Sequence, residues 1–443
     1  MARVPLFTRA SLLVVAVGLA VGPAAHAGAT GNAKPAATAS RASLLQDAAW
    51  IEKAVRPDGA IATNPDQRLV WPYLANFAAM GLARAAAVGD RRAADTAWRW
   101  LSWYQAHEDA HGYVDDYQRV GTGLQSLGTM DSTDAYAGTY LLAVESVFQA
   151  TGNHARLKSL RRGIDGAVRA IESTQDADGL TWAKPSWHVK YLMDQAETYA
   201  GLVAATNLGD ALGAANLAAH ALSDARRMHA GVARLWNRRA GSYDWAVHGS
   251  GAHAATNWSV LYPDAMQQAW AVAFGVVGGT RAHQLLATLT RMQPQWASPR
   301  ATATIGSART RVGYWAAATW ALRREGTSPS ARIHSIRSAA LSANRAWPFT
   351  SGVAGQLMVA EAAPLAPKPK PVAKTTAVVV RSDAAIVRPK RSVVATSSPS
   401  GDQTRWSWSL PAIIALALGA LTFGAAGPGG VLTRRRDAPE PRG

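Results

Sequence analysis

The connections between the predicted helices alternate in length, and this alternation constrains the fold more than any other feature of the sequence. From Ser43 to Ala362, apolar residues recur at helical spacing, and alternating strand patterns are almost absent. The short connections read AVGD, ATGN, NLGD, VVGG and REGT, where glycine suits the left-handed residue that ends a helix. The long connections span 56–71, 108–131, 175–193, 237–262, 294–309 and 344–350.

The fold class that this pattern predicts is all-α. Twelve helices are expected, at 43–55, 72–88, 92–107, 132–150, 154–174, 194–208, 211–236, 263–277, 281–293, 310–323, 328–343 and 351–362. Short turns at one end and long loops at the other describe six helical hairpins that share an orientation. Six hairpins closed in a ring make an (α/α)6 barrel, whereas an open series makes a superhelical stack. Periodicity alone does not choose between them.

Part of one hairpin recurs within the chain. MDSTDAYAG begins at Met130, and MDQAETYAG begins 63 residues later at Met193. In both copies Met-Asp is followed three residues on by a second carboxylate and then by Tyr-Ala-Gly. The spacing matches the period of one hairpin, so the copies fit a duplicated hairpin. The glycines, Gly138 and Gly201, are expected to permit close packing of helices.

Several stretches resemble the six-hairpin glycosidases, a superfamily of (α/α)6 barrels that includes glucoamylase-like enzymes and unsaturated glucuronyl hydrolases. They are WPYLANFAAMGLARA, WLSWYQAHEDAHGYVDDY, MDSTDAYAGTYLLAV and KYLMDQAETYAGL. The resemblance covers roughly residues 44–362, and its motifs specify the superfamily better than any one activity. It implies that the inner helices present their N-terminal ends, with the long loops before them, to a carbohydrate. It also implies inversion of configuration for most members.

Carboxylates gather at the predicted starts of inner helices. Glycoside hydrolysis needs one carboxyl that protonates the leaving oxygen and a second that activates water or attacks the sugar. Asp131 or Asp134 is predicted to supply one, and Asp194, Glu197 or Asp264 the other; the catalytic set is Asp131, Asp134, Asp194 and Glu197. The alternative is structural. Asp131 and Asp194 suit helix N-caps, and Glu197 stands where a capping box places its acid.

Aromatic side chains in or beside the long loops suit a sugar ligand, because their flat faces match the apolar faces of pyranose rings. The predicted substrate-binding residues are Trp71, Tyr73, Asp116, Trp182, Trp187, His188, Tyr243, Trp245 and Asp264. The alternative is that half or more of the tryptophans only seal the ends of the barrel. The histidines lack paired metal-ligand spacing, so neither a metal site nor another cofactor is expected.

Charge and cysteine content exclude other classes. Of the formal charge of +17, +8 lies in residues 363–443 and +2 in residues 1–27, which leaves +7 on residues 28–362. No basic stripe is interleaved with aromatics, so nucleic acid is not an expected partner. The chain has no cysteine, which rules out thiolate chemistry.

The two ends of the chain predict its location. Residues 1–27 resemble a secretory signal peptide with an A-x-A-like site, and a linker is predicted at 28–42. A Pro/Lys/Ser-rich stalk (363–405) leads to an uncharged transmembrane helix (406–432) and a basic tail (433–443). The domain at 43–362 is therefore expected, as a monomeric ectodomain, on the extracellular face of the cell membrane, with the C-terminus in the cytoplasm.

The leading functional hypothesis is a cell-surface glycoside hydrolase that acts on a poly- or oligosaccharide. One alternative is a non-catalytic glycan-binding protein on the same scaffold. The other is a polysaccharide lyase, which abstracts a proton beside a uronic acid and would need a base and a neutralising residue such as His253 and Asn257.

Overall fold

The computed structural model describes residues 33–296, 302–305, 308–311 and 315–362. Contacts divide the chain into two units, Met1–Ala39 and Ser40–Gly443. Of the first unit, only the start of helix α1 (Ala33–Lys53) is described, and this helix begins inside the predicted linker. The predicted signal peptide, stalk, transmembrane helix and tail lie outside the described residues. Within the described part of the chain, no helix is long and apolar enough to cross a membrane.

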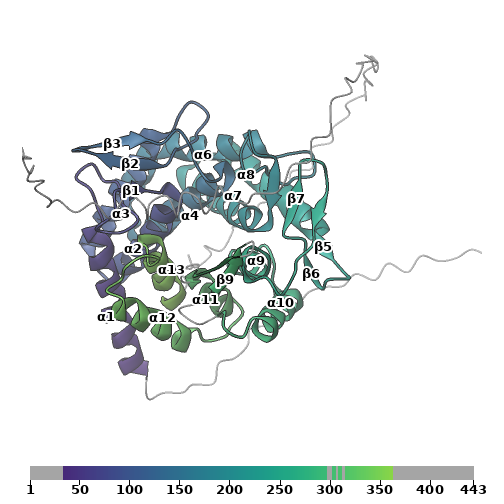
Figure 1. Cartoon of the computed structure of the whole chain (residues 1–443). Coiled ribbons are helices and arrows are strands. Elements are labelled where there is room, and N and C mark those ends of the chain that lie inside the picture. The colour runs from purple at the N-terminus through teal and green to yellow at the C-terminus, as the bar shows by residue number, and fades with distance from the viewer. Residues whose placement is uncertain (1–32, 297–301, 306–307, 312–314, 363–443) are drawn as a thin grey trace, which may run out of the picture. The chain divides into compact units, whose positions relative to one another are not determined.

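Six helices of the second unit form a closed inner ring. They are α2 (Pro72–Ala87), α4 (Thr133–Thr151), α7 (Leu192–Leu212), α9 (Met266–Ala273), α11 (Ala316–Arg324) and α13 (Ser351–Glu361). Each packs against the next in this order, and α13 packs against α2. Figure 1 shows the green α13 beside the purple α2. The last contact closes the ring, so the barrel is confirmed and the open stack is wrong.

The inner position follows from composition. Every residue of α9 is buried, as are Ser351–Ala360 of α13. A helix that is mostly apolar on every side must be covered on all sides, which the inner position in a helical ring provides.

The outer helices have a buried stripe on one side only. They are α3 (Arg91–His107), α5 (His154–Ser159), α6 (Arg161–Thr174), α8 (Ala215–Arg234), α10 (Gly279–Met292) and α12 (Ser330–Ser342). In α6, for example, the buried side chains Ile164, Val168 and Ile171 follow helical spacing. Each inner helix from α2 to α11 is followed by an outer return, so the inner helices run in one direction. Their N-terminal ends therefore share one end of the ring.

Helix α1 covers the place where the ring closes. Its Ser43 hydroxyl donates to Glu361 Oε1 at the end of α13, at 2.7 Å. Asp47 is buried and accepts hydrogen bonds from Arg337 and Arg345. The two guanidinium groups balance the charge of the buried carboxylate. These bonds join α1 to α12 and to the connection after α12.

Short strands lie in the long connections, where the sequence predicted almost none. Helix starts on neighbouring inner helices are tied together by two three-stranded antiparallel sheets. The first consists of β1 (Leu69–Val70), β2 (Tyr117–Val120) and β3 (Gly123–Ser126); the second, in spatial order, of β4 (Val189–Tyr191), β7 (Ala246–His248) and β8 (His253–Ala254). Two hairpins pair β5 (Trp236–Asn237) with β6 (Ser242–Tyr243) and β9 (Thr302–Ile305) with β10 (Ala308–Arg311).

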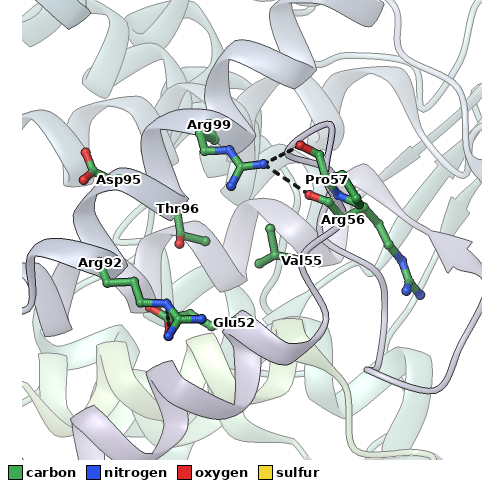
Figure 2. Close-up of a pocket in the computed structure, with 8 residues that line it drawn as sticks. All are labelled: Glu52, Val55, Arg56, Pro57, Arg92, Asp95, Thr96 and Arg99. Atoms are coloured by element: carbon green, nitrogen blue, oxygen red, sulfur yellow. Dashed lines mark hydrogen bonds and ion pairs between the residues drawn. The ribbon is translucent and has the colours of Figure 1, made fainter.

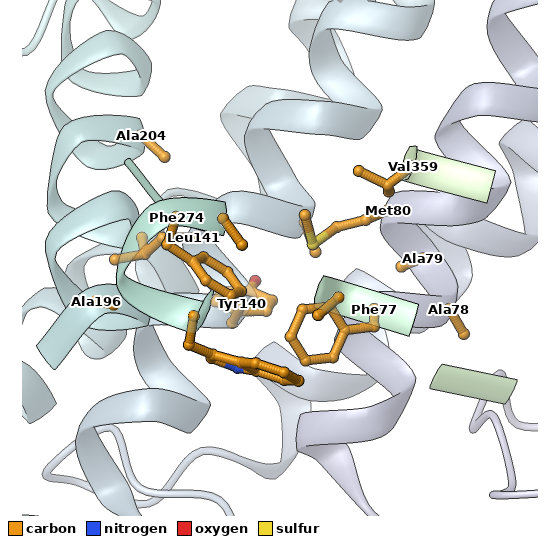
Figure 3. Close-up of a cluster of buried hydrophobic side chains, with 14 of the residues drawn as sticks. Phe77, Ala78, Ala79, Met80, Tyr140, Leu141, Ala196, Ala204, Phe274 and Val359 are labelled. Atoms are coloured by element: carbon orange, nitrogen blue, oxygen red, sulfur yellow. The ribbon is translucent and has the colours of Figure 1, made fainter. Parts of the chain in front are cut away.

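The hydrophobic core fills the ring with side chains from several inner helices. Figure 3 shows Phe77 and Met80 of α2, Tyr140 and Leu141 of α4 and Phe274 after α9 in one cluster. Phe77 and Phe274 make an edge contact with centroids 6.1 Å apart. The centre of the ring is therefore packed, not open.

The glycine of the repeated motif has a direct packing role. A Cβ on Gly201 would lie 2.4 Å from the Cα of Gly138, and a Cβ on Gly138 would lie 2.8 Å from the Cα of Thr198. Neither distance is tolerated, so α4 and α7 can approach this closely only where both helices carry glycine. The expectation that Gly138 and Gly201 permit close packing is confirmed.

Several predicted helix limits were wrong. The NLGD turn lies inside α7, which continues to Leu212 and ends at Gly213 with φ +66°. The predicted helix 154–174 is divided at Leu160 into α5 and α6. Residues 310–311 belong to β10, and α11 begins only at Ala316. A π-helical turn, η1 (Leu261–Ala265), precedes α9.

Candidate active site

The four predicted catalytic carboxylates occupy the N-terminal ends of two adjacent inner helices. Asp131 lies two residues before α4 and Asp134 lies in its first turn, while Asp194 and Glu197 lie near the start of α7. We call this the carboxylate end of the ring. The partial positive charge of helix N-termini favours carboxylates there.

Asp131 and Asp194 are not helix caps. The N-cap residues are Ser132 for α4 and Tyr191 for α7, and neither makes a side-chain capping bond. Among the described residues, no donor lies within hydrogen-bonding distance of the carboxyl group of Asp131 or Asp194. Asp131 is exposed, and Asp194 is 6% exposed. The capping alternative is therefore wrong for these two residues, whose oxygen atoms are unoccupied by internal bonds.

Asp134 is fixed by its neighbours. Its Oδ2 accepts from the Thr181 hydroxyl at 2.6 Å, and its Oδ1 accepts from the Ala135 backbone N–H at 2.8 Å. Thr181 lies in the long connection before α7, and its backbone N–H donates to Gln195 Oε1 at 2.8 Å. Asp134 thus holds the loop between α6 and α7 against the start of α4.

Glu197 joins three inner helices. Its Oε1 accepts from the Tyr73 hydroxyl of α2 at 2.6 Å and from Trp270 Nε1 of α9 at 2.8 Å. Its Oε2 is buried and has no hydrogen-bond partner among the described residues. Burying an oxygen that lacks a hydrogen-bond partner costs less free energy in a neutral, protonated carboxyl than in a carboxylate. The capping-box role is wrong for Glu197, which bonds across the ring instead of to its own helix.

The pKa values of these carboxyls are raised together. Burial raises the pKa of Asp134 to about 7 and that of Glu197 to about 8. Burial, and then the charges of Asp134, Glu197 and Asp131, raise the pKa of Asp194 well above its usual range. Desolvation also raises the pKa of Asp131, but the nearby Lys184 ammonium opposes this. The four residues therefore form one electrostatic group, in which burial favours the protonated forms.

Asp116 extends this group. It is buried in the connection before α4, and its Oδ1 accepts from the Tyr136 hydroxyl at 2.8 Å. Burial raises the pKa of Asp116 to about 7, and the charge of Asp131 contributes. Lys184 donates to the Met130 carbonyl at 2.6 Å, which keeps its cation beside the start of α4.

Asp264 makes no contact with the four predicted catalytic carboxylates among the described residues. It is in η1, and its Oδ2 accepts from the backbone N–H of Asn257 at 2.8 Å. Desolvation raises its pKa, and none of the other four carboxylates contributes to the shift. The lyase candidates are also engaged elsewhere, since His253 Nδ1 contacts Asp244 Oδ2 at 2.9 Å.

Of the predicted aromatic residues, three lie close to this group. Tyr73 contacts Glu197 directly. Trp187 is 52% exposed, and its Nε1 donates to the Tyr191 hydroxyl at 3.1 Å. Trp245 stacks on Tyr191 with centroids 6.1 Å apart. Tyr191 itself is near the acids, because the charges of Asp194 and Asp131 help raise its pKa after desolvation.

The other predicted aromatic and histidine residues have different surroundings. Trp71 is the N-cap of α2 and makes an edge contact with Trp347. Trp182 lies 3.9 Å below the Lys190 ammonium, and exposed His188 is tilted against it. Tyr243 is only 3% exposed and packs on Trp236, so it belongs to the core.

Sequence reasoning missed four aromatic residues of this end: Tyr191, Tyr262, Trp270 and Trp347. Burial raises the pKa of Tyr262, and the nearby charges of Asp131 and Asp194 raise it further. Trp270 lies inside the predicted helix 263–277, and its indole N–H donates to Glu197. One signal was available for two of them, since Tyr191 and Tyr262 stand at the very start of α7 and η1.

A separate cavity of about 540 Å³ lies between α1 and α3, away from the carboxylates (Figure 2). Its charged groups are already paired. Arg92 forms an ion pair with Glu52 at 2.8 Å, and Arg99 donates to the carbonyls of Arg56 and Pro57. These contacts join α1 and the loop after it to α3, and we assign the cavity no chemistry.

No protein-family model and no curated protein matches the chain. Solved structures do. A glycosidase in complex with glucose has 17% identity and a TM-score of 0.54, over 74% of this chain and 98% of its own. The GH63 mannosylglycerate hydrolase from Thermus thermophilus, in complex with glucose, has 13% identity and a TM-score of 0.51, over 73% and 99%. An uncharacterized conserved protein from the same organism has 14% identity, a TM-score of 0.51 and coverage of 73% and 99%.

These likenesses establish the fold. The helical domain is an (α/α)6 barrel, the fold that the resemblance of the sequence implied and that these solved glycosidases share.

Proposed function

We propose that the domain is a glycoside hydrolase whose active site is the carboxylate end of the ring. The observation that carries the proposal is the contrast among the four acids. Asp134 and Glu197 are held by internal hydrogen bonds, whereas the carboxyls of Asp131 and Asp194 are bonded to no described residue. Two unoccupied carboxyls on adjacent helices meet the requirement for an acid and a base. The glycosidase neighbours are consistent with this chemistry.

Asp194 suits the general acid. Burial and three neighbouring carboxylates raise its pKa, which favours the protonated form that a general acid needs in order to give a proton to the leaving oxygen. Asp131 suits the base or nucleophile, because it is exposed and the Lys184 ammonium opposes the rise in its pKa that desolvation causes. Different surroundings of two carboxyls are the usual basis for dividing acid and base roles.

Glu197 and Asp134 act in this scheme as positioning residues. Glu197 fixes α7 relative to Tyr73 and Trp270, and Asp134 fixes the loop before α7 through Thr181. Both contacts set the direction in which Asp194 projects.

The test is hydrolysis of a panel of oligo- and polysaccharides by the ectodomain and by its Asp131→Asn and Asp194→Asn variants. Loss of proton transfer predicts a fall in kcat of roughly 10²–10⁴ for either variant, with unchanged folding. Asp210→Asn is the matched control, because this exposed aspartate lies at the other end of the same helix, α7. Turnover that survives in both variants would contradict the assignment. Glycan binding without turnover in the wild type would favour a non-catalytic glycan-binding protein.

The proposed location is the outer face of the cell membrane, supported by the signal-like start, the stalk and the apolar segment followed by Arg434–Arg436. Protease added to intact cells should release a soluble fragment that ends within 363–405. Full protection of the helical domain would contradict this topology.

A further inference from the structure

Two tryptophans of the described residues are strongly exposed, and both precede inner helices. Trp187 is 52% exposed and Trp347 is 43% exposed. Trp187 lies five residues before the start of α7, and Trp347 lies four residues before the start of α13. Because all inner helices begin at the carboxylate end, both tryptophans lie at that end. Exposing a large aromatic surface to water is unfavourable, whereas an exposed aromatic face suits the apolar face of a sugar ring.

The positions of these helices in the ring place the two tryptophans on opposite sides. In the order α2, α4, α7, α9, α11 and α13, helices α7 and α13 are three places apart in a closed ring of six. Neighbouring helices pack about 8–10 Å apart, so opposite axes in a six-membered ring are separated by roughly 16–20 Å. Asp131 lies before α4, and Asp194 lies in α7, so both acids are on one side of this span.

Each tryptophan is supported by a second aromatic residue. The Trp187 Nε1–H donates to the Tyr191 hydroxyl at 3.1 Å, and Tyr191 stacks on Trp245. Trp347 makes an edge contact with Trp71, with centroids 6.2 Å apart. Trp71 begins the helix that carries Tyr73, the hydrogen-bond partner of Glu197. Both exposed rings thus contact aromatic residues that lie close to the carboxylates, which favours a role in binding at this site.

We infer that Trp187 and Trp347 are stacking platforms for sugar rings on opposite sides of the active site, and that the substrate is an extended oligosaccharide chain. The inference rests on the proposed glycosidase function and deepens it. Trp187 would hold the chain beside the reacting bond, since it is next to Asp194 and Asp131 through Tyr191. Trp347 would hold a sugar several rings away. A mono- or disaccharide is too short to contact both.

The experiment uses malto-, cello- and chito-oligosaccharides from disaccharide to hexasaccharide. In the wild-type ectodomain, kcat/KM on the accepted series should increase with chain length and level off once both platforms are covered. Trp347→Ala should lower kcat/KM on the hexasaccharide about tenfold, and by a smaller factor on the disaccharide. Trp187→Ala should lower it at every length, because its platform is beside the bond that breaks. Trp347→Tyr, which keeps an aromatic face, should restore most of the loss.

The control is Leu341→Ala, an exposed apolar residue on the preceding helix α12, which should change neither kcat/KM nor its dependence on length. Calorimetric binding of the same sugars to the Asp194→Asn variant separates this inference from the proposed function. Length-dependent binding that Trp347→Ala removes would support the platforms even without turnover. Turnover with no dependence on length, and no effect of Trp347→Ala, would overturn the platforms and leave the hydrolase intact. Neither turnover nor binding would overturn both.

Discussion

At the scale of single residues, the repeated motif places equivalent acids in different environments. Asp131 is exposed before its helix, whereas Asp194 is buried inside the first turn of α7. Asp134 is bonded within its own neighbourhood, whereas Glu197 accepts from two other inner helices. A duplicated hairpin therefore supplies four carboxyls of similar spacing and dissimilar chemistry, which is what an acid–base pair with its supports requires.

Glu197 should tolerate an amide but not truncation. In Glu197→Ala, the Tyr73 hydroxyl and the Trp270 N–H lose their acceptor inside the ring, at a cost of roughly 1–3 kcal/mol for each group. In Glu197→Gln the amide oxygen keeps both bonds, and near pH 6 the native residue is itself protonated, because burial raises its pKa to about 8. Urea denaturation at pH 6 should therefore show a large loss for Ala and about 1 kcal/mol or less for Gln. Equal losses would contradict the bridging role.

At the scale of helices and loops, the sequence predicted what is local. The helical period and the glycine turns identified all six inner helices, because long apolar segments that end at glycine are visible locally in the sequence. Strands of two to four residues were missed, because such segments are too short to show alternation. The limit of α7 was missed because Gly209 resembles a helix end. Gly209 instead serves close packing, because a Cβ at this position would lie only 2.7 Å from the backbone nitrogen of Ala218 in the next helix.

The contact between α4 and α7 is the element on which the site most depends. Gly138→Ala should force these helices apart, because the new methyl group would lie 2.8 Å from the Cα of Thr198 and 2.9 Å from the Glu197 carbonyl oxygen. Overpacking of this kind costs about 1–3 kcal/mol, and it should also lower kcat by displacing Asp194 relative to Asp131.

The control for this variant is Gly278→Ala, since Gly278 begins an outer helix, has no atom within 4 Å of a built Cβ and has φ −144°. Thermal unfolding and turnover of the two variants should differ clearly. Similar behaviour of both would mean that the glycine contact is dispensable.

At the scale of the whole domain, closure of the ring could not be read from the sequence. It depends on the contact of α13 with α2, which are separated by most of the chain and share no sequence signal. The same holds for the site. The acids could be predicted from their spacing, but the partners that distinguish them could not, because Tyr73, Trp270 and Thr181 come from three other segments. The opposed positions of Trp187 and Trp347 likewise exist only once the ring is closed.

The assembled domain also has a pH dependence that no single helix would show. Burial raises the pKa of Asp116 and Asp134 to about 7, of Glu197 to about 8 and of Glu108 to about 9. In the unfolded chain these groups titrate near pH 4. Between pH 4 and 9 the folded state therefore binds more protons than the unfolded state, and the free energy of unfolding must fall as pH rises.

We therefore expect the urea midpoint of the ectodomain to fall steadily from pH 5 to pH 9, by an amount on the order of a few kcal/mol in the free energy of unfolding. Measurement at constant ionic strength keeps the surface charges comparably screened. Glu108→Gln is the informative variant. Glu108 ends the outer helix α3, and the charges that act on it are those of Arg162, Arg169 and Asp109, not those of the four carboxylates. Its loss should reduce the slope from pH 5 to pH 9 and leave the curve nearly flat above pH 8, without altering catalysis. A midpoint that rises from pH 5 to 9 would show that these carboxyls are ionised in the folded domain, and it would remove the basis for a protonated Asp194.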